Sequence, residues 1–370
     1  MKDFYNTVVI GAGPAGAACG ITLAKSGADV CLIDKAVFPR SKTCAGLVTG
    51  KTYRLIEQLF GKTPDESLFC AGASRVALFK KSKCLVEAEL HTPVRLVNRK
   101  HFDNALVERY RALGGELLEG EQVTLDTKNS KIKLSDGRTL GYKSLVLADG
   151  ALSMARKMLG LGTDKLAFGI EAYVPADRLR VESVNLYFDY LKDGYAWAFP
   201  HGDTVCVGAA DRCNKKEDYR AILTRVLKDL GVEPNPEAYI GAFLPYGHLP
   251  AQDRLPQNIM LAGDAGGYAD PISGEGLYMA LQTGIYAAEA MKTDSPKKTY
   301  LQSTARLERI IKDGLNTQKM LYNPLLHKRF LSGVEGRQGL VAYFFENMVE
   351  DYRYEYREVL KLLSNYGKKK

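Results

Sequence analysis

The sequence lacks several features that would assign it to common classes of protein. No apolar stretch approaches the ~20 residues that a helix needs to span a bilayer. The first apolar run begins within a few residues of Met1, so we expect no secretory signal peptide. The seven cysteines include no Cys-x-x-Cys pair, which argues against a disulfide framework or zinc site and favours a reducing cytoplasm. The five histidines are scattered, so we expect no metal site and no Ser/His/Asp triad. No segment has the pattern of a nucleic-acid recognition module.

What the chain has is enough apolar content to bury a sizeable core, with 46% of its 370 residues hydrophobic. Its net charge of +8 is unevenly distributed. Residues 297–370 hold 15 Lys and Arg against 8 Asp and Glu, and therefore carry +7 of that total. A basic surface of this kind favours contact with an anionic membrane face or a diphosphate-bearing substrate, and a solvated helical face is the alternative. We keep peripheral membrane contact as a hypothesis.

The N-terminus carries the pattern of a dinucleotide-binding fold. An apolar run is followed by the turn Gly11-Ala-Gly-Pro-Ala-Gly16, and a second apolar run ends at Asp34. Gly11 allows a tight turn, Gly13 lets the backbone approach a pyrophosphate, and Gly16 lets the helix pack closely on the strand. The N-terminus of that helix then binds the pyrophosphate. Asp34 is placed to accept hydrogen bonds from ribose hydroxyls, so this pattern predicts FAD or NAD.

Two later strand ends distinguish between these dinucleotides. One apolar run is followed by Asp149-Gly150, and another by Gly263-Asp264 and then a helix rich in small residues from Leu277. A carboxylate at a strand end can bind a ribityl hydroxyl, and the free amides before Leu277 can face an anionic flavin edge. A nicotinamide dehydrogenase has no need of this second element. We therefore predict FAD.

The three strand-end motifs in this order resemble the FAD-dependent oxidoreductases of the p-hydroxybenzoate hydroxylase type. Two further motifs narrow the resemblance: Arg40-Ser-Lys-Thr-Cys-Ala-Gly46 after the first carboxylate, and Tyr195-Ala-Trp-Ala-Phe-Pro200 in a later strand. Together they resemble the geranylgeranyl reductase family, whose members carry Arg-x-Lys-x-Cys-Gly and Tyr-x-Trp-x-Phe-Pro. The resemblance covers roughly residues 1–290. It departs from the family at Ala45, where glycine is usual.

The patterns and the resemblance imply an α/β fold. We expect a Rossmann-like FAD-binding domain, an inserted mixed or antiparallel β-sheet substrate domain, and a helical C-terminal region. The predicted bounds are 1–70, 98–160 and 250–296 for the FAD-binding domain, 71–97 and 161–249 for the substrate domain, and 297–370 for the helical region. The spacing of Phe102, Leu106 and Tyr110 predicts a helix over 99–112.

One amphipathic stripe is predicted near the C-terminus. Between residues 341 and 366, apolar side chains recur in steps of three and four. The aromatic residues of this stretch could line a lipid pocket or touch a membrane interface. The alternative is a stripe that packs on the protein itself.

The resemblance also implies which residues form the site. Cys44 would lie beside the flavin, and Tyr195, Trp197 and Phe199, which share one face of a strand, would line the substrate cavity unless they are sheet core. Cys44, Tyr195 or water would supply a proton. The predicted cofactor-binding residues are Gly11, Gly13, Pro14, Ala15, Gly16, Asp34, Lys35, Arg40, Cys44, Ala45, Gly46, Arg99, Val123, Asp149, Gly150, Gly263, Asp264, Gly274, Gly276 and Leu277. The predicted substrate residues are Tyr195, Trp197, Phe199 and Pro200, with no metal ligand.

Three functions remain open on these observations. The favoured one is reduction of a carbon–carbon double bond in a prenyl or isoprenoid lipid by hydride from non-covalent FAD. No second glycine fingerprint exists for a nicotinamide, so NAD(P)H would bind transiently or a ferredoxin would donate electrons. An FAD monooxygenase acting on an apolar or aromatic substrate uses the same fold and the same three motifs. The third hypothesis is a flavin-bound protein that binds a polyprenyl lipid without turnover.

Overall fold

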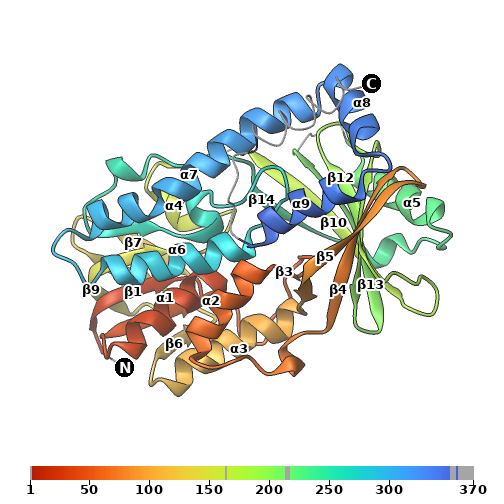
Figure 1. Ribbon diagram of the computed structural model, residues 1–370. Helices are drawn as coiled ribbons and strands as arrows, with labels where there is room; N and C mark the ends of the chain where they lie inside the picture. The colour runs from red at the N-terminus through yellow and green to blue at the C-terminus, as the bar shows by residue number, and fades with distance from the viewer. Residues whose placement is uncertain (1, 163–164, 213–216, 351–355, 357–370) are drawn as a thin grey trace.

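The computed structural model describes residues 2–162, 165–212, 217–350 and 356. These residues form two β-sheets, and the C-terminal helices extend from one sheet to the other (Figure 1). One sheet is mainly parallel and the other mainly antiparallel, and helices pack against both. The predicted α/β fold class is confirmed.

The first sheet is mainly parallel and contains the glycine turn. Its strands are β1 (Phe4–Ile10), β2 (Val30–Asp34), β6 (Glu116–Glu119), β7 (Val123–Asp126), β8 (Lys131–Leu134), β9 (Thr139–Leu147) and β15 (Ile259–Leu261). Their order is β6-β2-β1-β9-β8-β7, and β15 pairs in parallel with β9. All five residues of β2 are buried, as expected for a parallel strand covered on both faces. The carboxyl ends of β1, β2, β9 and β15 therefore meet at one edge of the sheet.

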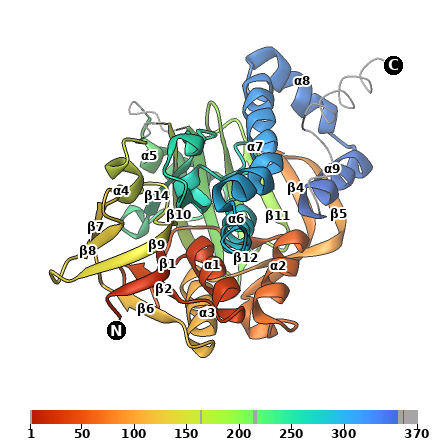
Figure 2. The same ribbon diagram turned by 90° about the vertical axis from the view of Figure 1, so that its left-hand side faces the viewer.

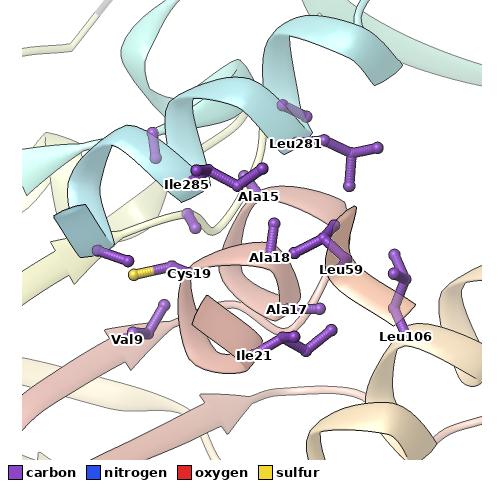
Figure 3. Packing of buried hydrophobic residues seen from close by; sticks show 14 of the residues in the cluster. Val9, Ala15, Ala17, Ala18, Cys19, Ile21, Leu59, Leu106, Leu281 and Ile285 are labelled. Carbon is purple, nitrogen blue, oxygen red and sulfur yellow. The ribbon is translucent and has the colours of Figure 1, made fainter. Parts of the chain in front are cut away.

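Two helices cover one face of this sheet in close contact. Helix α1 (Pro14–Lys25) follows the glycine turn, and Figure 3 shows its Ala15 next to Ile285 of α6 (Leu277–Ala290). A Cβ atom at Gly284 of α6 would lie 2.1 Å from the carbonyl oxygen of Ala15. The small residues of both helices are therefore required by the distance between their backbones.

The second sheet is antiparallel except for one pair of strands. Its strands are β3 (Leu47–Val48), β4 (Ala71–Lys80), β5 (Lys83–Leu96), β10 (Leu166–Pro175), β11 (Val184–Phe188), β12 (Tyr195–His201), β13 (Thr204–Arg212) and β14 (Ile240–Pro245). Their order is β14-β10-β13-β12-β11-β4-β5-β3, with β11 parallel to β4. This pairing joins segments on either side of residues 97–165.

The helices between these strands are short. They are α2 (Gly50–Phe60), α3 (Arg99–Ala112), α4 (Met154–Met158) and α5 (Tyr219–Asp229), with the 3₁₀ turns η1 (Glu66–Leu68), η2 (Pro236–Ala238), η3 (Gln252–Arg254) and η4 (Gly263–Gly266). Helix α3 has the predicted bounds. Its N-cap is Asn98, whose side chain accepts a hydrogen bond from the Lys100 amide.

Among the residues that the structure describes, three helices follow α6: α7 (Pro296–Leu321), α8 (Pro324–Val334) and α9 (Gln338–Glu350). Helix α7 passes over α6, and α8 and α9 lie over β5 at the side of the second sheet (Figures 1 and 2). Helix α9 contains the first part of the predicted amphipathic stripe, and positions 352, 359, 363 and 366 of that stripe lie outside the described residues. In the part of the chain that the structure describes, no helix has the length and apolar content to cross a membrane.

The division into domains remains a prediction, although the strands sort clearly between the two sheets. Strands within residues 71–96 and 166–245 belong to the second sheet, and the remaining strands belong to the first, with one exception. Residues 47–48 form β3 of the second sheet, because they pair with Leu96 and Arg95 of β5. This short strand lies within the segment predicted for FAD binding, so the chain contacts the second sheet earlier than the sequence indicated.

Candidate cofactor and substrate site

One cavity of about 1370 Å³ connects the edge of the first sheet to the second sheet. Most residues predicted to bind the cofactor line it, together with three of the four predicted substrate residues. These lining residues are Gly11, Gly13, Pro14, Ala15, Asp34, Lys35, Arg40, Cys44, Ala45, Gly46, Arg99, Val123, Asp149, Gly150, Asp264, Gly274, Gly276, Leu277, Tyr195, Trp197 and Phe199. Its volume is above the usual range for a pocket that holds one drug-sized ligand, so it has room for both a cofactor and a substrate.

Three predicted site residues lie outside the cavity lining. A Cβ atom at Gly16 would lie 1.7 Å from the carbonyl oxygen of Gly11, and one at Gly263 would lie 2.8 Å from the Cβ of Ala15. These two glycines therefore allow close packing around α1 and have no contact with the cavity. Pro200 alternates with the aromatic residues of β12, which places its side chain on the other face of the strand.

The glycine turn has the geometry that a pyrophosphate site requires. Gly11 has φ +98°, and a Cβ atom there would lie 2.3 Å from the carbonyl oxygen of Ala148. At Gly13, which directly precedes α1, a Cβ atom would meet one atom within 4 Å, the Nη2 of Arg40 at 3.3 Å. The backbone at Gly13 is therefore open to the cavity, with a helix N-terminus and a guanidinium beside it. Both favour an anion, so the residues present fit the pyrophosphate of FAD.

Asp34 lies at the carboxyl end of β2, where a ribose would be bound. Its Oδ2 accepts a hydrogen bond of 2.7 Å from the Ala12 amide, and its Oδ1 accepts one of 2.8 Å from the Ala36 amide. These bonds fix the carboxylate against the glycine turn. Each carboxylate oxygen can accept more than one hydrogen bond, so the arrangement fits ribose hydroxyls in addition to the two amides.

The two later carboxylates differ in their contacts. Asp149 accepts hydrogen bonds from the hydroxyl of Ser153 and from the amide of Ala155, 3.1 Å away, at the start of α4. Burial raises the pKa of Asp149. Asp264 instead pairs with Lys42 Nζ at 3.5 Å. The carboxylate of Asp149 therefore has a clear structural role at α4, and Asp264 is the better placed of the two to contact a ligand.

A buried ionic cluster holds the two predicted arginines. Arg99 donates from Nε and Nη2 to Asp103, over 2.7 and 2.8 Å, and Arg40 Nη2 lies 3.2 Å from the same carboxylate. Burial alone would raise the pKa of Asp103, but Arg99 outweighs it, so the pKa lies below its ordinary value. The positive charge of Arg99 is thus paired with a carboxylate inside the protein. Asp103 also orients Arg40 toward Gly13. The sequence did not indicate Asp103 as a site residue.

The three aromatic residues of β12 form one wall of the cavity. The ring centroids of Tyr195 and Trp197 are 6.3 Å apart, as are those of Trp197 and Phe199. The hydroxyl of Tyr195 donates a hydrogen bond to the carbonyl oxygen of Ser273, in the loop before α6. Burial, together with the charges of Asp270 and Glu275, raises the pKa of Tyr195. This phenol is therefore neutral at ordinary pH and already engaged as a donor.

The far end of the cavity is apolar and is lined in part by the C-terminal helices α8 and α9. Its lining there comes from β4, β11, α8 and α9: Leu78, Val184, Leu186, Phe188, Phe330, Val334, Leu340, Val341, Phe344, Phe345 and Met348. A lipid pocket is one of the three alternatives that the sequence leaves for the aromatic residues of 341–366. Phe344 and Phe345 do line the cavity, and α9 also packs on β5.

Helix α9 is attached to the cofactor end of the cavity by charged groups. Lys51 of α2 donates to the carbonyl oxygen of Met348 and forms an ion pair of 2.8 Å with Glu275, in the loop before α6. Arg54, one turn along α2, pairs with Glu350 at 2.8 Å. The apolar wall and the loop facing the predicted flavin site are thus connected through one buried lysine.

A family model described as pyridine nucleotide-disulphide oxidoreductase matches residues 5–210, more than half of the chain. The chain belongs to this family. It is therefore an FAD-dependent oxidoreductase. The six cysteines that the structure describes are free, so the oxidoreductase has no disulfide among its described residues.

Relatives confirm the resemblance to geranylgeranyl reductases. An uncharacterized protein of Methanosarcina barkeri is 32% identical over 295 residues, covering 78% of this chain and 75% of that protein. Menaquinone reductase of Mycolicibacterium smegmatis is 28% identical over 323 residues, covering 79% and 77%. Geranylgeranyl diphosphate reductase of Rhodobacter capsulatus is 28% identical over 302 residues, covering 77% and 74%.

Solved structures share the fold over nearly the whole chain. A geranylgeranyl bacteriochlorophyll reductase-like protein from Thermoplasma acidophilum has a TM-score of 0.79 at 18% identity, covering 98% of this oxidoreductase and 99% of that protein. PqsL, a probable FAD-dependent monooxygenase from Pseudomonas aeruginosa, has a TM-score of 0.71 at 18% identity, covering 90% and 99%. The fold is thus common to a reductase-like protein and to a probable monooxygenase. The fold therefore does not distinguish reduction from monooxygenation.

Proposed function

We propose that this oxidoreductase reduces carbon–carbon double bonds of a prenyl lipid. The observation that carries the proposal is the continuous cavity, which is polar at the glycine turn and apolar between the second sheet and α8 and α9. A long apolar chain would lie along the apolar end and place one double bond beside the cofactor. Relatives named menaquinone reductase and geranylgeranyl diphosphate reductase support this substrate class.

In this proposal each end of the cavity has a separate task. Gly13, Arg40 and Asp34 hold the pyrophosphate and ribose of FAD, and Asp264 binds its ribityl chain. FAD supplies the hydride when it is bound. Trp197 and Phe199 press the alkene against the cofactor and exclude water from the reacting carbon. Electrons reach the cofactor from NAD(P)H or a ferredoxin.

The experiment is anaerobic reoxidation of the reduced holoprotein by geranylgeranyl diphosphate, followed by flavin absorbance and by mass spectrometry of the lipid. A gain of two hydrogens per flavin supports the proposal. No reoxidation without oxygen, but oxygen uptake and an oxygenated product in a parallel aerobic sample, would favour the monooxygenase instead. Tight lipid binding with no change in flavin or lipid would identify a binding protein without turnover.

The corner between α7 and α8 is where we propose peripheral membrane contact. Met320, Leu325 and Leu326 are exposed there, with Leu325 at 69%, and the basic side chains Lys319, Lys328 and Arg329 lie among them in the sequence. Exposed apolar side chains among cations favour an anionic bilayer surface. A protein that takes a lipid into a cavity lined by α8 gains access to its substrate from such a position.

A further inference from the structure

A buried carboxyl group of the cavity has no part in the reaction as described so far. Glu171 lies in β10, lines the cavity and is 1% exposed. Its Oε1 accepts a hydrogen bond of 3.0 Å from the amide of Cys44, on the loop predicted to lie beside the flavin. The same oxygen accepts one of 3.2 Å from the hydroxyl of Tyr173. The Sγ of Cys206 on β13 lies 3.7 Å from Oε2.

Burial favours the neutral form of Glu171, whereas its hydrogen-bond donors favour the carboxylate. Burial raises the pKa of Glu171, and the donors on Cys44, Tyr173 and Cys206 and the charge of Arg99 on α3 only partly oppose it. Arg99 is itself paired with Asp103, which limits the charge it presents to other groups. Oε1 accepts from the Cys44 amide and the Tyr173 hydroxyl, whereas Oε2 faces the thiol of Cys206, which is both a weak donor and a weak acceptor. Oε2 is therefore the oxygen better placed to carry an acid proton.

Tyr173 connects this acid to solvent. It lies two residues along β10 on the same face as Glu171 and is 38% exposed. The ring of His201 packs against it with centroids 5.1 Å apart. Burial lowers the pKa of His201. The imidazole is therefore neutral and places no positive charge beside the Tyr173 phenol. A proton path from solvent to the cavity would therefore pass first through Tyr173 and then through Glu171.

We propose that Glu171 is the resident acid of the site and that Tyr173 reloads it from solvent. This rests on the proposed function, because saturation of an alkene needs one hydride and one proton. The hydride goes to one carbon from FAD, the Glu171 O–H bond breaks, and a C–H bond forms at the other carbon. Burial raises the pKa of Tyr173, so a free phenolate is disfavoured and the reloading is a concerted relay. The phenolic proton of Tyr173 passes to Oε1 of the carboxylate while a hydronium ion gives its proton to the phenol oxygen, and rotation of the carboxyl group then exchanges its two oxygens. Each turnover thus consumes one solvent proton.

Tyr195 is less suited to this task, because it directs its proton to the Ser273 carbonyl oxygen. Cys44 contacts Glu171 through its backbone amide, which stabilises the carboxylate that remains after proton transfer. In this scheme the Cys44 amide therefore positions Glu171.

The first test measures protonation without turnover. Infrared spectra of the FAD-bound wild type at pH 7 should contain a protonated carboxyl band that is missing in Glu171→Gln, which keeps the side chain's size and its acceptor for the Cys44 amide. Asp211→Asn is the matched control, because Asp211 is another buried carboxyl of the second sheet, on β13, whose pKa burial raises to about 6. Identical carboxyl bands in the wild type and Glu171→Gln would overturn the proposal.

The second test separates delivery of the proton from its replacement. In anaerobic reoxidation by geranylgeranyl diphosphate, Glu171→Gln should be slower by about 10²–10⁴-fold, with unchanged FAD content and unchanged reduction by dithionite. With excess dithionite present to reduce the flavin again after each turnover, Tyr173→Phe should complete its first turnover at the wild-type rate, because the acid is already loaded, and should slow in later turnovers. Asp211→Asn should behave as wild type in both phases.

The outcomes are distinguishable from failure of the proposed function. If the wild type is not reoxidised by the lipid although the infrared band belongs to Glu171, the function is wrong and the resident acid stands. If the wild type turns over and Glu171→Gln turns over equally fast, the acid is refuted and the function stands. Equal later turnovers in Tyr173→Phe and the wild type would refute the reloading step.

Discussion

Replacing Asp103 with asparagine tests whether the buried ionic cluster supports both stability and the cofactor site. Asp103 is fully buried and contacts Arg99 twice and Arg40 once, at 2.7 to 3.2 Å. Asparagine has nearly the same shape but no charge, and its NH₂ group would face a guanidinium. Arg99, itself buried, would then keep its positive charge without a matching carboxylate.

The expected loss follows from the burial of this cluster. Removing one partner of a buried ion pair typically costs about 3–5 kcal/mol, because the other charge stays behind uncompensated. We expect Asp103→Asn to lower the free energy of unfolding by an amount in this range. Since Arg40 lies beside Gly13, the variant should also bind FAD more weakly.

The pH dependence has a defined sign. The pKa of Asp103 is lowered in the folded state, so its contribution is fully present above the ordinary value of 3.8 and is lost as pH falls through the folded-state pKa. The difference between wild type and variant should therefore be constant between about pH 5 and pH 8. A difference that changes across this window would contradict the assigned charge state.

The assay is urea denaturation of FAD-saturated protein followed by far-ultraviolet circular dichroism, with FAD affinity measured separately by fluorescence. Asp136→Asn is the matched control, because Asp136 pairs with Arg138 at an exposed turn, where an ion pair contributes little. A loss of stability in Asp103→Asn as small as that in the control would refute the reasoning, as would unchanged FAD affinity.

Three further predictions address the two ends of the cavity and the membrane. Gly13→Val should lose FAD, because the valine side chain would occupy the space beside Arg40. Gly162→Val should keep FAD, because a Cβ atom there would meet one atom within 4 Å, Lys157 Cγ at 3.9 Å. Retention of FAD by Gly13→Val would contradict the pyrophosphate site. Trp197→Ala should retain FAD, lose stability by about 3–5 kcal/mol, and lose lipid reduction; wild-type kinetics would make the ring structural only. Leu325→Glu should reduce flotation with anionic liposomes at low salt, whereas Val37→Glu, at a position 65% exposed in the loop after β2, should not; equal flotation would exclude the corner of α7 and α8 as the contact.

The cofactor end of the cavity was predictable because its signals are local. The glycine turn, Asp34 and the later strand-end motifs each lie within a short segment, and the rules of parallel sheets bring the carboxyl ends of their strands to one edge. Helix α3 was predictable for the same reason, since apolar spacing and an asparagine cap define it without reference to the rest of the chain. A glycine needed for packing and one needed for a ligand look identical in the sequence, so the sequence did not show that Gly16 and Gly263 lie outside the cavity lining.

The sequence could not predict which helices line the apolar end of the cavity. An amphipathic stripe shows that a helix buries one face but not which surface it covers, so residues 341–366 left three alternatives. The structure places α9 over β5 and ties it to α2 and Glu275 through Lys51. That contact joins positions almost 300 residues apart in the chain, and no local pattern encodes it.

The sequence by itself determined the cofactor class, the α/β fold and the order of the motifs, because these depend on short-range spacing of glycines, carboxylates and apolar residues. Only the tertiary structure decided which charges are matched and which groups share the cavity. Asp103 and Glu171 are ordinary acidic residues of a helix and a strand until folding removes their solvent and sets Arg99 beside one and Cys44 beside the other. Desolvation and pairing arise from contacts distant in sequence, and these gave both carboxyl groups their altered pKa values.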